Sequence, residues 1–344
     1  MDLAFSCAER VKSTTLPNPA VGAVFVKNGL IVSSGATRPA GGDHAEITAL
    51  KKARGEARGA TLYVTLEPCA HFGRTPPCTR ALIEAGVRKV VATCEDPNPK
   101  VAGKGFEALR RAGIEVVTGV RRERAEEFYG GFFFWIRNGR PRIVAKIAQS
   151  LDGRINAAPG LETPITGEEA RRFAHGLRAR ADAILVGGAT LRADDPDLTP
   201  RLTGGVPPHA LVLTRRRRLD PALRLFAAGR RSGTTVLSPH ASTGLPARVG
   251  HFRLAPRKPL VDQLMAFFAE RGYHEVLLEG GRGVWAPFLE AGLCDVLHLV
   301  TAPMLLPGGE AWSAGLDPRW AKPLEFHRFT PLGSDMLAEF RRSS

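Results

Sequence analysis

The sequence is poor in cysteine and lacks any long apolar run, and each shortage excludes a class of protein. Its 344 residues include five cysteines, an odd number that disfavours a disulfide framework and favours the reducing environment of the cytoplasm. No stretch stays apolar for the roughly 20 residues that a membrane-spanning helix needs. No charged segment leads into a short apolar one near Met1, so we expect neither a membrane span nor a secretory leader.

What remains is the composition expected of a soluble globular enzyme, with 44% hydrophobic and 24% charged residues. A chain of this length exceeds the size at which one hydrophobic core is usual, so we expect two domains. The segment 137–141 interrupts an aromatic-rich helical stretch, and a strand-like run follows it. We therefore predict one domain over residues 1–140 and a second over residues 141–344.

The formal net charge is +14, and most of the excess is arginine scattered along the chain. Only Arg215–Arg218 forms a dense run, and two interpretations stay open for it. Such a run is commonly a solvated face or loop. The functional alternative is a site for a phosphorylated small molecule or an anionic cofactor. The charge therefore favours an anionic ligand without selecting one.

In the first half, helix-like and strand-like segments alternate, which predicts an α/β domain with helices on both faces of a sheet. Lys27-Asn28-Gly29 joins the first two strands and is a strong hairpin signal, because Asn-Gly accepts positive φ. The predicted strands are residues 20–26, 30–34, 61–66, 88–93 and 114–118. The predicted helices are residues 44–54, 78–85, 104–112 and 123–135.

The second half alternates in the same way and ends in a predicted β-hairpin that pairs residues 324–327 with 336–340. It carries no Gly-x-Gly-x-x-Gly at its first βα turn, so we do not expect a dinucleotide-binding Rossmann domain. The predicted strands are residues 142–147, 183–187, 209–214, 234–238, 275–279 and 295–301. The predicted helices are residues 168–179, 260–271 and 284–291.

Four residues of the first half carry recognisable chemistry. His44, Cys69 and Cys78 supply one imidazole and two thiolates, three of the four ligands of a tetrahedral zinc ion, and a catalytic site leaves the fourth position to water. Glu46 lies two residues from His44, close enough to pass protons to and from that water as the catalytic residue. This arrangement is typical of zinc-dependent nucleobase deaminases. We expect Asp43 to cap the helix that begins here.

Over essentially its whole length the chain resembles the bifunctional riboflavin-biosynthesis deaminase–reductases. The gap of eight residues between Cys69 and Cys78 is the specific part, because nucleic-acid deaminases usually carry Pro-Cys-x-x-Cys. The matching stretches of the first half are residues 17–22, 44–46, 65–78, 96–99 and 101–105. Those of the second half are residues 146–154, 177–179, 187–196, 198–201 and 279–281.

The resemblance implies a fold class and two successive reactions. The fold would be a cytidine-deaminase-like three-layer α/β/α domain followed by a dihydrofolate-reductase-like α/β domain. With zinc, the first would deaminate 2,5-diamino-6-ribosylamino-4(3H)-pyrimidinone 5′-phosphate. With NADPH, the second would reduce the ribosyl group to ribityl, giving 5-amino-6-ribitylaminouracil 5′-phosphate. The resemblance also implies a homo-oligomer, dimer or tetramer, with no nucleic-acid or membrane partner.

The resemblance assigns roles to matching positions. In the deaminase, Asn18 and His71 would contact the pyrimidine or ribose, and Arg74 the 5′-phosphate. By turn chemistry alone Asn18 is equally a turn residue between two prolines, and His71 and Arg74 equally lie in a solvated loop. The NADPH positions of the reductase are Ala148, Thr190, Asp194, Gly281, Arg282 and Gly283. Its substrate positions are Lys146, Arg178, Leu198, Arg201 and Glu279.

For the predicted substrate residues of the reductase half, roles without substrate binding stay open. Lys146 and Glu279 would form a plain ion pair, and Arg178 and Arg201 would be surface residues. The chain also departs from the family's usual pattern at residues 162–166, where Glu-Thr-Pro-Ile-Thr replaces Ser-x-Trp-Ile-Thr. A glutamate there would repel a phosphate, and a proline cannot stack as tryptophan does, so a weakened reductase is one expectation.

Two rival functions are compatible with part of the sequence. The first is a nucleic-acid or tRNA deaminase with an accessory domain, which the basic charge favours. The second is a structural zinc protein, but a structural site prefers four protein ligands, and no fourth stands at a suitable spacing. Substitution of Glu46 separates the rivals, because only a hydrolytic site depends on that carboxyl.

Overall fold

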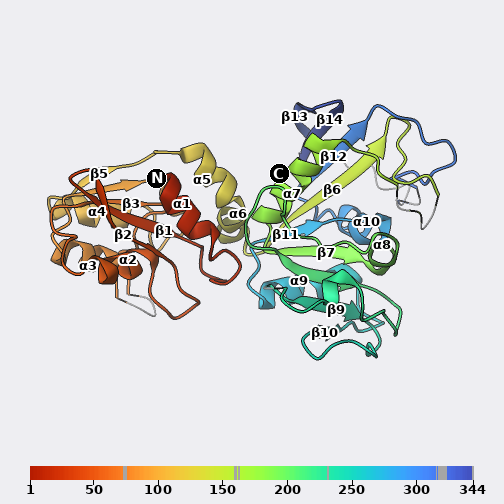
Figure 1. The fold of residues 1–344 in the computed structure, drawn as a ribbon, viewed down its shortest axis with the longest axis horizontal. Helices are drawn as coiled ribbons and strands as arrows, with labels where there is room; N and C mark the ends of the chain where they lie inside the picture. Colours follow the sequence, from red (N-terminus) through yellow and green to blue (C-terminus); the bar gives the residue numbers. More distant parts are fainter. Residues whose placement is uncertain are drawn as a thin grey trace. The chain divides into compact units, whose positions relative to one another are not determined.

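The computed structural model describes residues 1–72, 76–158, 161, 163–230, 232–314, 316 and 324–342. The chain forms two compact units, Met1–Arg140 and Pro141–Ser344, coloured red to yellow and green to blue in Figure 1. Each unit has its own sheet, with five strands in the first and nine in the second. Over the described ranges, no helix is long and apolar enough to cross a membrane.

The N-terminal unit is built on a sheet with the strand order β2-β1-β3-β4-β5. β1 runs antiparallel to β2 and β3, whereas β3, β4 and β5 are parallel. The strands are β1 (Gly22–Lys27), β2 (Leu30–Ala36), β3 (Thr61–Val64), β4 (Lys89–Ala92) and β5 (Glu115–Val117). The helices are α1 (Asp2–Glu9), α2 (Ala45–Ala53), α3 (Cys78–Glu84), α4 (Lys104–Arg111), α5 (Arg122–Phe128) and α6 (Gly130–Asn138).

Helices cover both faces of this sheet, because alternate residues of a strand point to opposite sides. Phe25, Leu62 and Val90 share one apolar core with the buried residues of α2, α3 and α4. On the other face, Phe5 of α1 clusters with Tyr129 and with residues of α5 and α6. The result is the three-layer α/β/α arrangement that the sequence predicts.

Most predicted elements of this unit are confirmed to within two or three residues at their ends. In the predicted hairpin, Asn28 and Gly29 have φ values of 52° and 77°, as a tight turn requires. The single helix predicted over residues 123–135 is wrong. Two helices, α5 and α6, divide at Tyr129, where Gly130 and Gly131 lower helix propensity.

The predicted capping role of Asp43 is also wrong. His44 is the N-cap of α2, and no side chain caps that helix. The Asp43 carboxylate instead pairs with Lys51 of the same helix, Oδ2 to Nζ at 2.6 Å.

The C-terminal unit contains a nine-stranded sheet in the order β10-β9-β8-β7-β11-β6-β12-β14-β13. It is parallel from β10 through β12, and β14 runs antiparallel to β12 and β13. The strands are β6 (Arg142–Ser150), β7 (Ala183–Gly187), β8 (His209–Leu213), β9 (Thr234–Ser238), β10 (Gly250–Arg253), β11 (Glu275–Leu278), β12 (Val296–Ala302), β13 (Leu324–Leu332) and β14 (Asp335–Arg342). The helices are α7 (Glu168–Arg180), α8 (Gly188–Asp194), α9 (Leu260–Glu270), α10 (Arg282–Glu290) and the short 3-10 turn η1 (Arg224–Phe226).

The central parallel strands β7, β8, β9 and β11 are buried on both faces, so they are apolar along their length rather than alternating. On one face, Leu177 of α7 shares a core with Ile184 and Val186 of β7. Among the helices of the unit, α9 and α10 meet through Phe268 and Phe288, whose rings stack 6.3 Å apart. The sequence did not predict α8 or β10. α8 starts with a glycine, and β10 is mostly exposed and lacks an apolar pattern.

Candidate functional site

Two helix starts and one turn bring the predicted zinc ligands together in the N-terminal unit. His44 stands at the N-cap of α2, Cys78 opens α3, and Cys69 lies in the segment after β3. The His44 Nδ1 atom lies 3.5 Å from Cys69 Sγ and 3.3 Å from Cys78 Sγ. The three ligand atoms lie within 4.8 Å of one another and form the one metal-binding group found among the described residues.

Glu46 projects from the first turn of α2 into the same place, and its side chain is buried. Burial, reinforced by the nearby Cys69 sulfur, raises the pKa of the Glu46 carboxyl to about 7. A hydrogen bond from Cys78 lowers the pKa of Cys69. The cluster thus combines soft metal ligands with a buried carboxyl that exchanges its proton near neutral pH.

Glu67 holds the turn that carries Cys69, a role that sequence analysis missed. Its buried carboxylate accepts the backbone N–H groups of Asp96, Gly103, Gly105 and Phe106 at 2.8–3.3 Å. Three of these donors belong to the start of α4. The N-cap of that helix, Gly103, has no side chain to serve as a cap. A glycine at the N-cap could have indicated from sequence that a side chain elsewhere in the chain caps α4.

The predicted deaminase substrate residues are only partly described. Asn18 is half-buried in a turn, where its N–H donates to Thr15 O at 2.9 Å and its carbonyl accepts from the Thr15 hydroxyl. His71 has a buried Nδ1 atom with no hydrogen-bond partner in the described part of the chain. The predicted phosphate residue, Arg74, lies outside the described residues.

A cavity of about 750 Å³ opens at the carboxyl edge of the parallel strands in the C-terminal unit. Of the predicted cofactor residues, Thr190, Gly281, Arg282 and Gly283 line it. Gly281 donates its N–H to Thr190 Oγ1 at 3.2 Å, which joins the start of α10 to α8. The two other predicted positions, Ala148 of β6 and Asp194 at the end of α8, are not among its described lining residues.

Glycine is required where this cavity meets α10. Gly280 has a φ of +105°, and a Cβ atom there would lie 2.8 Å from Thr190 Oγ1. The chain can therefore turn tightly from β11 into α10, and the helix presents its N-terminus to the cavity. A helix N-terminus of this kind favours a bound phosphate.

Three predicted substrate residues gather in the same unit. Arg178 of α7 binds Glu279, after β11, through two parallel hydrogen bonds of 3.0 and 2.7 Å. The plain ion pair proposed between Lys146 and Glu279 is therefore replaced by this bidentate pair. Burial acts to raise the pKa of Glu279, but Arg178 outweighs it and the net pKa is lowered. Burial lowers the pKa of Lys146, on which both charges act.

Leu198 and Arg201 lie on a loop that approaches this cluster. Leu198 is buried and has a φ of 52°. Arg201 is exposed and donates to Asp197 Oδ2 at 2.8 Å, while the next residue, Leu202, donates its N–H to His175 Nδ1 at 3.4 Å. Sequence analysis missed His175, which lies one helical turn before Arg178 on α7.

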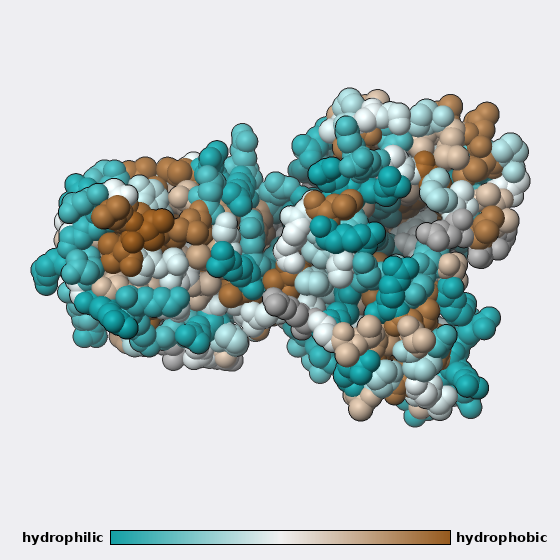
Figure 2. All heavy atoms as spheres, in the orientation of Figure 1, coloured by the Kyte–Doolittle hydropathy of each residue, from teal (hydrophilic) through white to brown (hydrophobic). Residues whose placement is uncertain are grey.

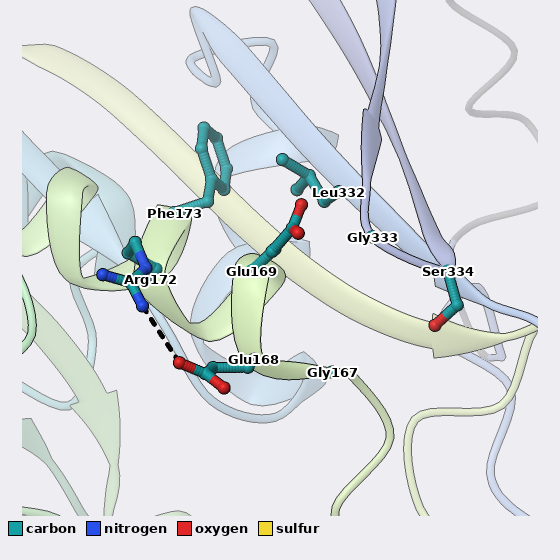
Figure 3. Close-up of a pocket in the computed structure, with 8 residues that line it drawn as sticks. All are labelled: Gly167, Glu168, Glu169, Arg172, Phe173, Leu332, Gly333 and Ser334. Atoms are coloured by element: carbon teal, nitrogen blue, oxygen red, sulfur yellow. Dashed lines mark hydrogen bonds and ion pairs between the residues drawn. The ribbon is translucent and has the colours of Figure 1, made fainter.

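A second cavity, of about 790 Å³, lies between the start of α7 and the turn that joins β13 to β14 (Figure 3). Glu169 points toward that turn, and Glu168 pairs with Arg172 at 2.9 Å. Nearby, Asp335 Oδ2 accepts the Gly167 N–H at 2.7 Å. No predicted site residue is among its described lining residues, and its carboxylates oppose binding of a phosphate.

Two known families match this chain, one in each half. The cytidine and deoxycytidylate deaminase zinc-binding region matches residues 1–94. The RibD C-terminal domain matches residues 141–338. The fold class predicted for the two halves is thereby confirmed.

Curated relatives match along nearly the whole chain. The riboflavin biosynthesis protein RibD of Bacillus amyloliquefaciens is 38% identical, over 98% of this chain and 94% of its own. The RibD of Escherichia coli is 39% identical over 89% of this chain and 87% of its own. The RibD of Mycobacterium tuberculosis is 42% identical over 90% of this chain and 85% of its own.

Solved structures agree. Acinetobacter baumannii RibD is 35% identical, covers 100% of this chain and 98% of its own, and superposes with a TM-score of 0.75. A Thermotoga maritima protein, described as a diaminohydroxyphosphoribosylaminopyrimidine deaminase/5-amino-6-(5-phosphoribosylamino)uracil reductase, is 32% identical, covers 100% and 97% of the two chains, and gives a TM-score of 0.77. With both halves matched in order and over their full span, the chain belongs to the RibD family of riboflavin biosynthesis proteins.

Proposed function

We propose that this chain carries both activities of the RibD family in one polypeptide. Residues 1–140 hydrolyse the amine of 2,5-diamino-6-ribosylamino-4(3H)-pyrimidinone 5′-phosphate. Residues 141–344 then reduce the ribosyl group of the product, giving 5-amino-6-ribitylaminouracil 5′-phosphate. The observation that carries the proposal is the convergence of His44, Cys69 and Cys78 beside the buried Glu46 carboxyl.

The donor set of this cluster fits zinc. One imidazole nitrogen and two sulfurs lie within 4.8 Å of one another, and no fourth ligand joins them from the described residues, as a catalytic zinc site requires. A zinc ion bound there supplies a water activated near neutral pH. The Glu46 carboxyl accepts the proton of the attacking water and delivers it to the departing amine, for which a pKa of about 7 is well suited.

We assign the pyrimidine or ribose contacts to Asn18 and His71, and the 5′-phosphate contact to Arg74. The buried Nδ1 atom of His71, which has no hydrogen-bond partner among the described residues, supports its part, because a buried polar atom gains from a hydrogen bond to substrate. The resemblance alone supports Arg74, whose guanidinium suits a phosphate.

The C-terminal cavity fits NADPH, which supplies the hydride of the second reaction. Its volume of about 750 Å³, the glycine turn at Gly280 and the N-terminus of α10 suit a dinucleotide with a pyrophosphate. We assign cofactor contacts to Ala148, Thr190, Asp194, Gly281, Arg282 and Gly283.

We assign the substrate contacts of the reductase to Lys146, Arg178, Leu198, Arg201 and Glu279. Arg178 and Glu279 orient each other through their two hydrogen bonds, so the half-buried cluster is rigid before substrate arrives. Arg201 exposes its guanidinium and is the member suited to the substrate phosphate.

We further propose that the protein works in the cytoplasm as a homo-oligomer, dimer or tetramer. All five cysteines are free, which is compatible with a reducing compartment. Exposed apolar surface supports association. Figure 2 shows a brown hydrophobic area on the N-terminal unit, and the edge strand β13 exposes Phe326 and Phe329. Light scattering of the purified protein tests the oligomeric state.

A product assay by mass spectrometry tests the two activities. Zinc-loaded protein given the diaminopyrimidinone substrate should release ammonia without NADPH, and should form the ribityl product only when NADPH is added. Removal of zinc with a chelator should abolish ammonia release and leave reduction of the deaminated intermediate intact. Absence of deamination in a zinc-loaded sample contradicts the proposal.

A further inference from the structure

The run Arg215–Arg218 divides into two pairs with different surroundings. Arg215 and Arg216 line the cavity that holds the predicted cofactor residues. Arg217 and Arg218 are not among its described lining residues, and their backbone contacts Thr243, whose N–H donates to Arg217 O at 2.9 Å. The solvated-loop interpretation therefore suits the second pair, and the anion-binding interpretation suits the first.

Positive charge gathers on this wall of the cavity without matching acid. Arg192, Lys258 and Arg282 line it together with Arg215 and Arg216, and Glu310 is the sole acidic side chain among its described lining residues. Arg192 and Arg216 line the same cavity, and burial together with the positive charge of Arg216 lowers the pKa of Arg192. Like charges held close in this way are relieved by a bound anion.

Arg215 and Arg216 lie at some distance from the start of α10, because their strands are not neighbours in the sheet. Gly281 follows β11, Gly188 follows β7, and Arg215 follows β8, and these three strands are adjacent and parallel. Adjacent strands are about 4.8 Å apart, so the arginines lie roughly 10 Å across the edge from the helix N-terminus. Both NADPH and NADH have a pyrophosphate that can bind at α10. Only NADPH carries a further phosphate, on its adenosine ribose, that could bind at a separate place.

We infer that Arg215 and Arg216 bind the 2′-phosphate of NADPH and make this chain select NADPH over NADH. The inference deepens the proposed reductase function and depends on it. Two guanidinium groups that have no acidic partner among the described residues provide charge-assisted hydrogen bonds to a dianionic phosphate. NADH lacks that group and leaves the two cations unneutralised.

Binding of NADPH and NADH, measured by isothermal titration calorimetry on the zinc-loaded full chain, tests the inference. The variant is Arg215→Gln with Arg216→Gln, and the matched control is Arg217→Gln with Arg218→Gln, which removes the same charge from the adjacent pair. We expect the first variant to bind NADPH at least about tenfold more weakly while NADH binding changes little. The control should bind both dinucleotides as the parent protein does. A near-ultraviolet circular-dichroism spectrum and an unfolding midpoint that match those of the parent protein confirm that the C-terminal unit of each variant is folded.

Three results would overturn the inference. The first variant could retain its NADPH affinity, both variants could weaken NADPH equally, or NADPH and NADH could weaken together. The second result would mean a general electrostatic field, and the third, in a variant shown to be folded, a contact with the pyrophosphate that both dinucleotides share. A parent protein that binds neither dinucleotide contradicts the proposed reductase itself, which distinguishes failure of the function from failure of this assignment.

Discussion

The Glu67 carboxylate accepts the Gly105 N–H at 2.8 Å, and this bond joins the turn of Cys69 to the start of α4. The approach is close on both sides, because a Cβ atom on Gly105 would lie 2.0 Å from the Pro68 carbonyl oxygen. α4 therefore begins against the backbone of the residue that precedes Cys69. The position of one zinc ligand depends on a helix that follows it by more than thirty residues.

Glu67→Gln should weaken both the N-terminal unit and its zinc site. The glutamine amide places an N–H₂ group where the carboxylate accepted backbone donors, so buried N–H groups lose their partner. A buried donor left unsatisfied costs about 1–3 kcal/mol. We expect the unfolding free energy of the unit to fall by at least that amount and zinc to bind less tightly, with NADPH binding unchanged.

Urea unfolding and zinc competition with a chromophoric chelator measure the two effects. Glu84→Gln is the control, because its pair with Arg80 is exposed on α3 and exposed pairs contribute about 0–1 kcal/mol. Equal effects of the two substitutions would contradict a special role for Glu67.

Glu46→Gln should abolish deamination while zinc stays bound. The glutamine keeps the shape of the side chain but cannot take and return a proton, and such proton transfer contributes about 10²–10⁴-fold to rate. Ammonia release measures the loss, and metal analysis measures zinc per chain. Retained deamination would favour the structural-zinc rival, in which this carboxyl has no chemical task.

Glu279→Gln should destabilise the C-terminal unit and impair reduction. Arg178 and Glu279 have side chains only 16% and 11% exposed, so the substitution leaves a guanidinium buried without its counter-charge. Removing one partner of a buried pair typically costs about 3–5 kcal/mol. Denaturant unfolding and single-turnover reduction of the deaminated intermediate measure the two losses, and ammonia release should persist.

Glu168→Gln is the matched control on α7, since its pair with Arg172 is largely exposed. It should leave stability within about 0.5 kcal/mol of the parent protein. If the two substitutions reduced stability equally, the Arg178–Glu279 pair would have no special energetic weight.

The C-terminal unit should lose stability in acid because of His209. The ring contacts Tyr273 Oη at 2.6 Å and Thr235 Oγ1 at 3.0 Å, and burial lowers its pKa to about 4. Between that value and about 6.5, the pKa of an unfolded histidine, the unfolded chain binds more protons, so the unfolding free energy falls as pH falls.

His209 contributes up to about 3 kcal/mol to the pH dependence of the unfolding free energy. This contribution is fully present above about pH 6.5 and is lost as the pH approaches 4. Unfolding curves across this range, followed by the fluorescence of Trp285 and Trp312, measure the slope. His209→Gln should flatten it, whereas His251→Gln, at an exposed position of β10, should not. An unchanged slope in the first variant would contradict the assignment.

The sequence predicts the zinc cluster well because its information is local. His44 and Glu46 lie two residues apart at one helix start, and Cys78 opens the next helix, so element positions alone bring their side chains together. The central strands of both sheets were predictable for the same reason, since they are short apolar runs between turns, whereas the exposed edge strand β10 was not.

Pairings over long separations could not be predicted in this way. Arg178 and Glu279 are 101 residues apart, and only the order of strands around β11 brings them together. Glu67 likewise finds donors 29–39 residues later, after helix α3 and strand β4 have intervened. Periodicity reports which face a residue occupies and carries no information about its partner.

The loops at the carboxyl edge of the second sheet have a consequence for how this protein changes over generations. Hydrogen bonds between backbones hold β7, β8 and β11 in register, whereas the residues that line the cavity follow those strands. A substitution at Arg215 or Arg216 would change the charge of this edge and leave the hydrogen-bonded strands beneath it intact. The ligand preference of the C-terminal unit can therefore change with little effect on its folding. The N-terminal unit differs, because Glu67 joins the turn that carries Cys69 to the start of α4, so a change there affects both the zinc site and the fold.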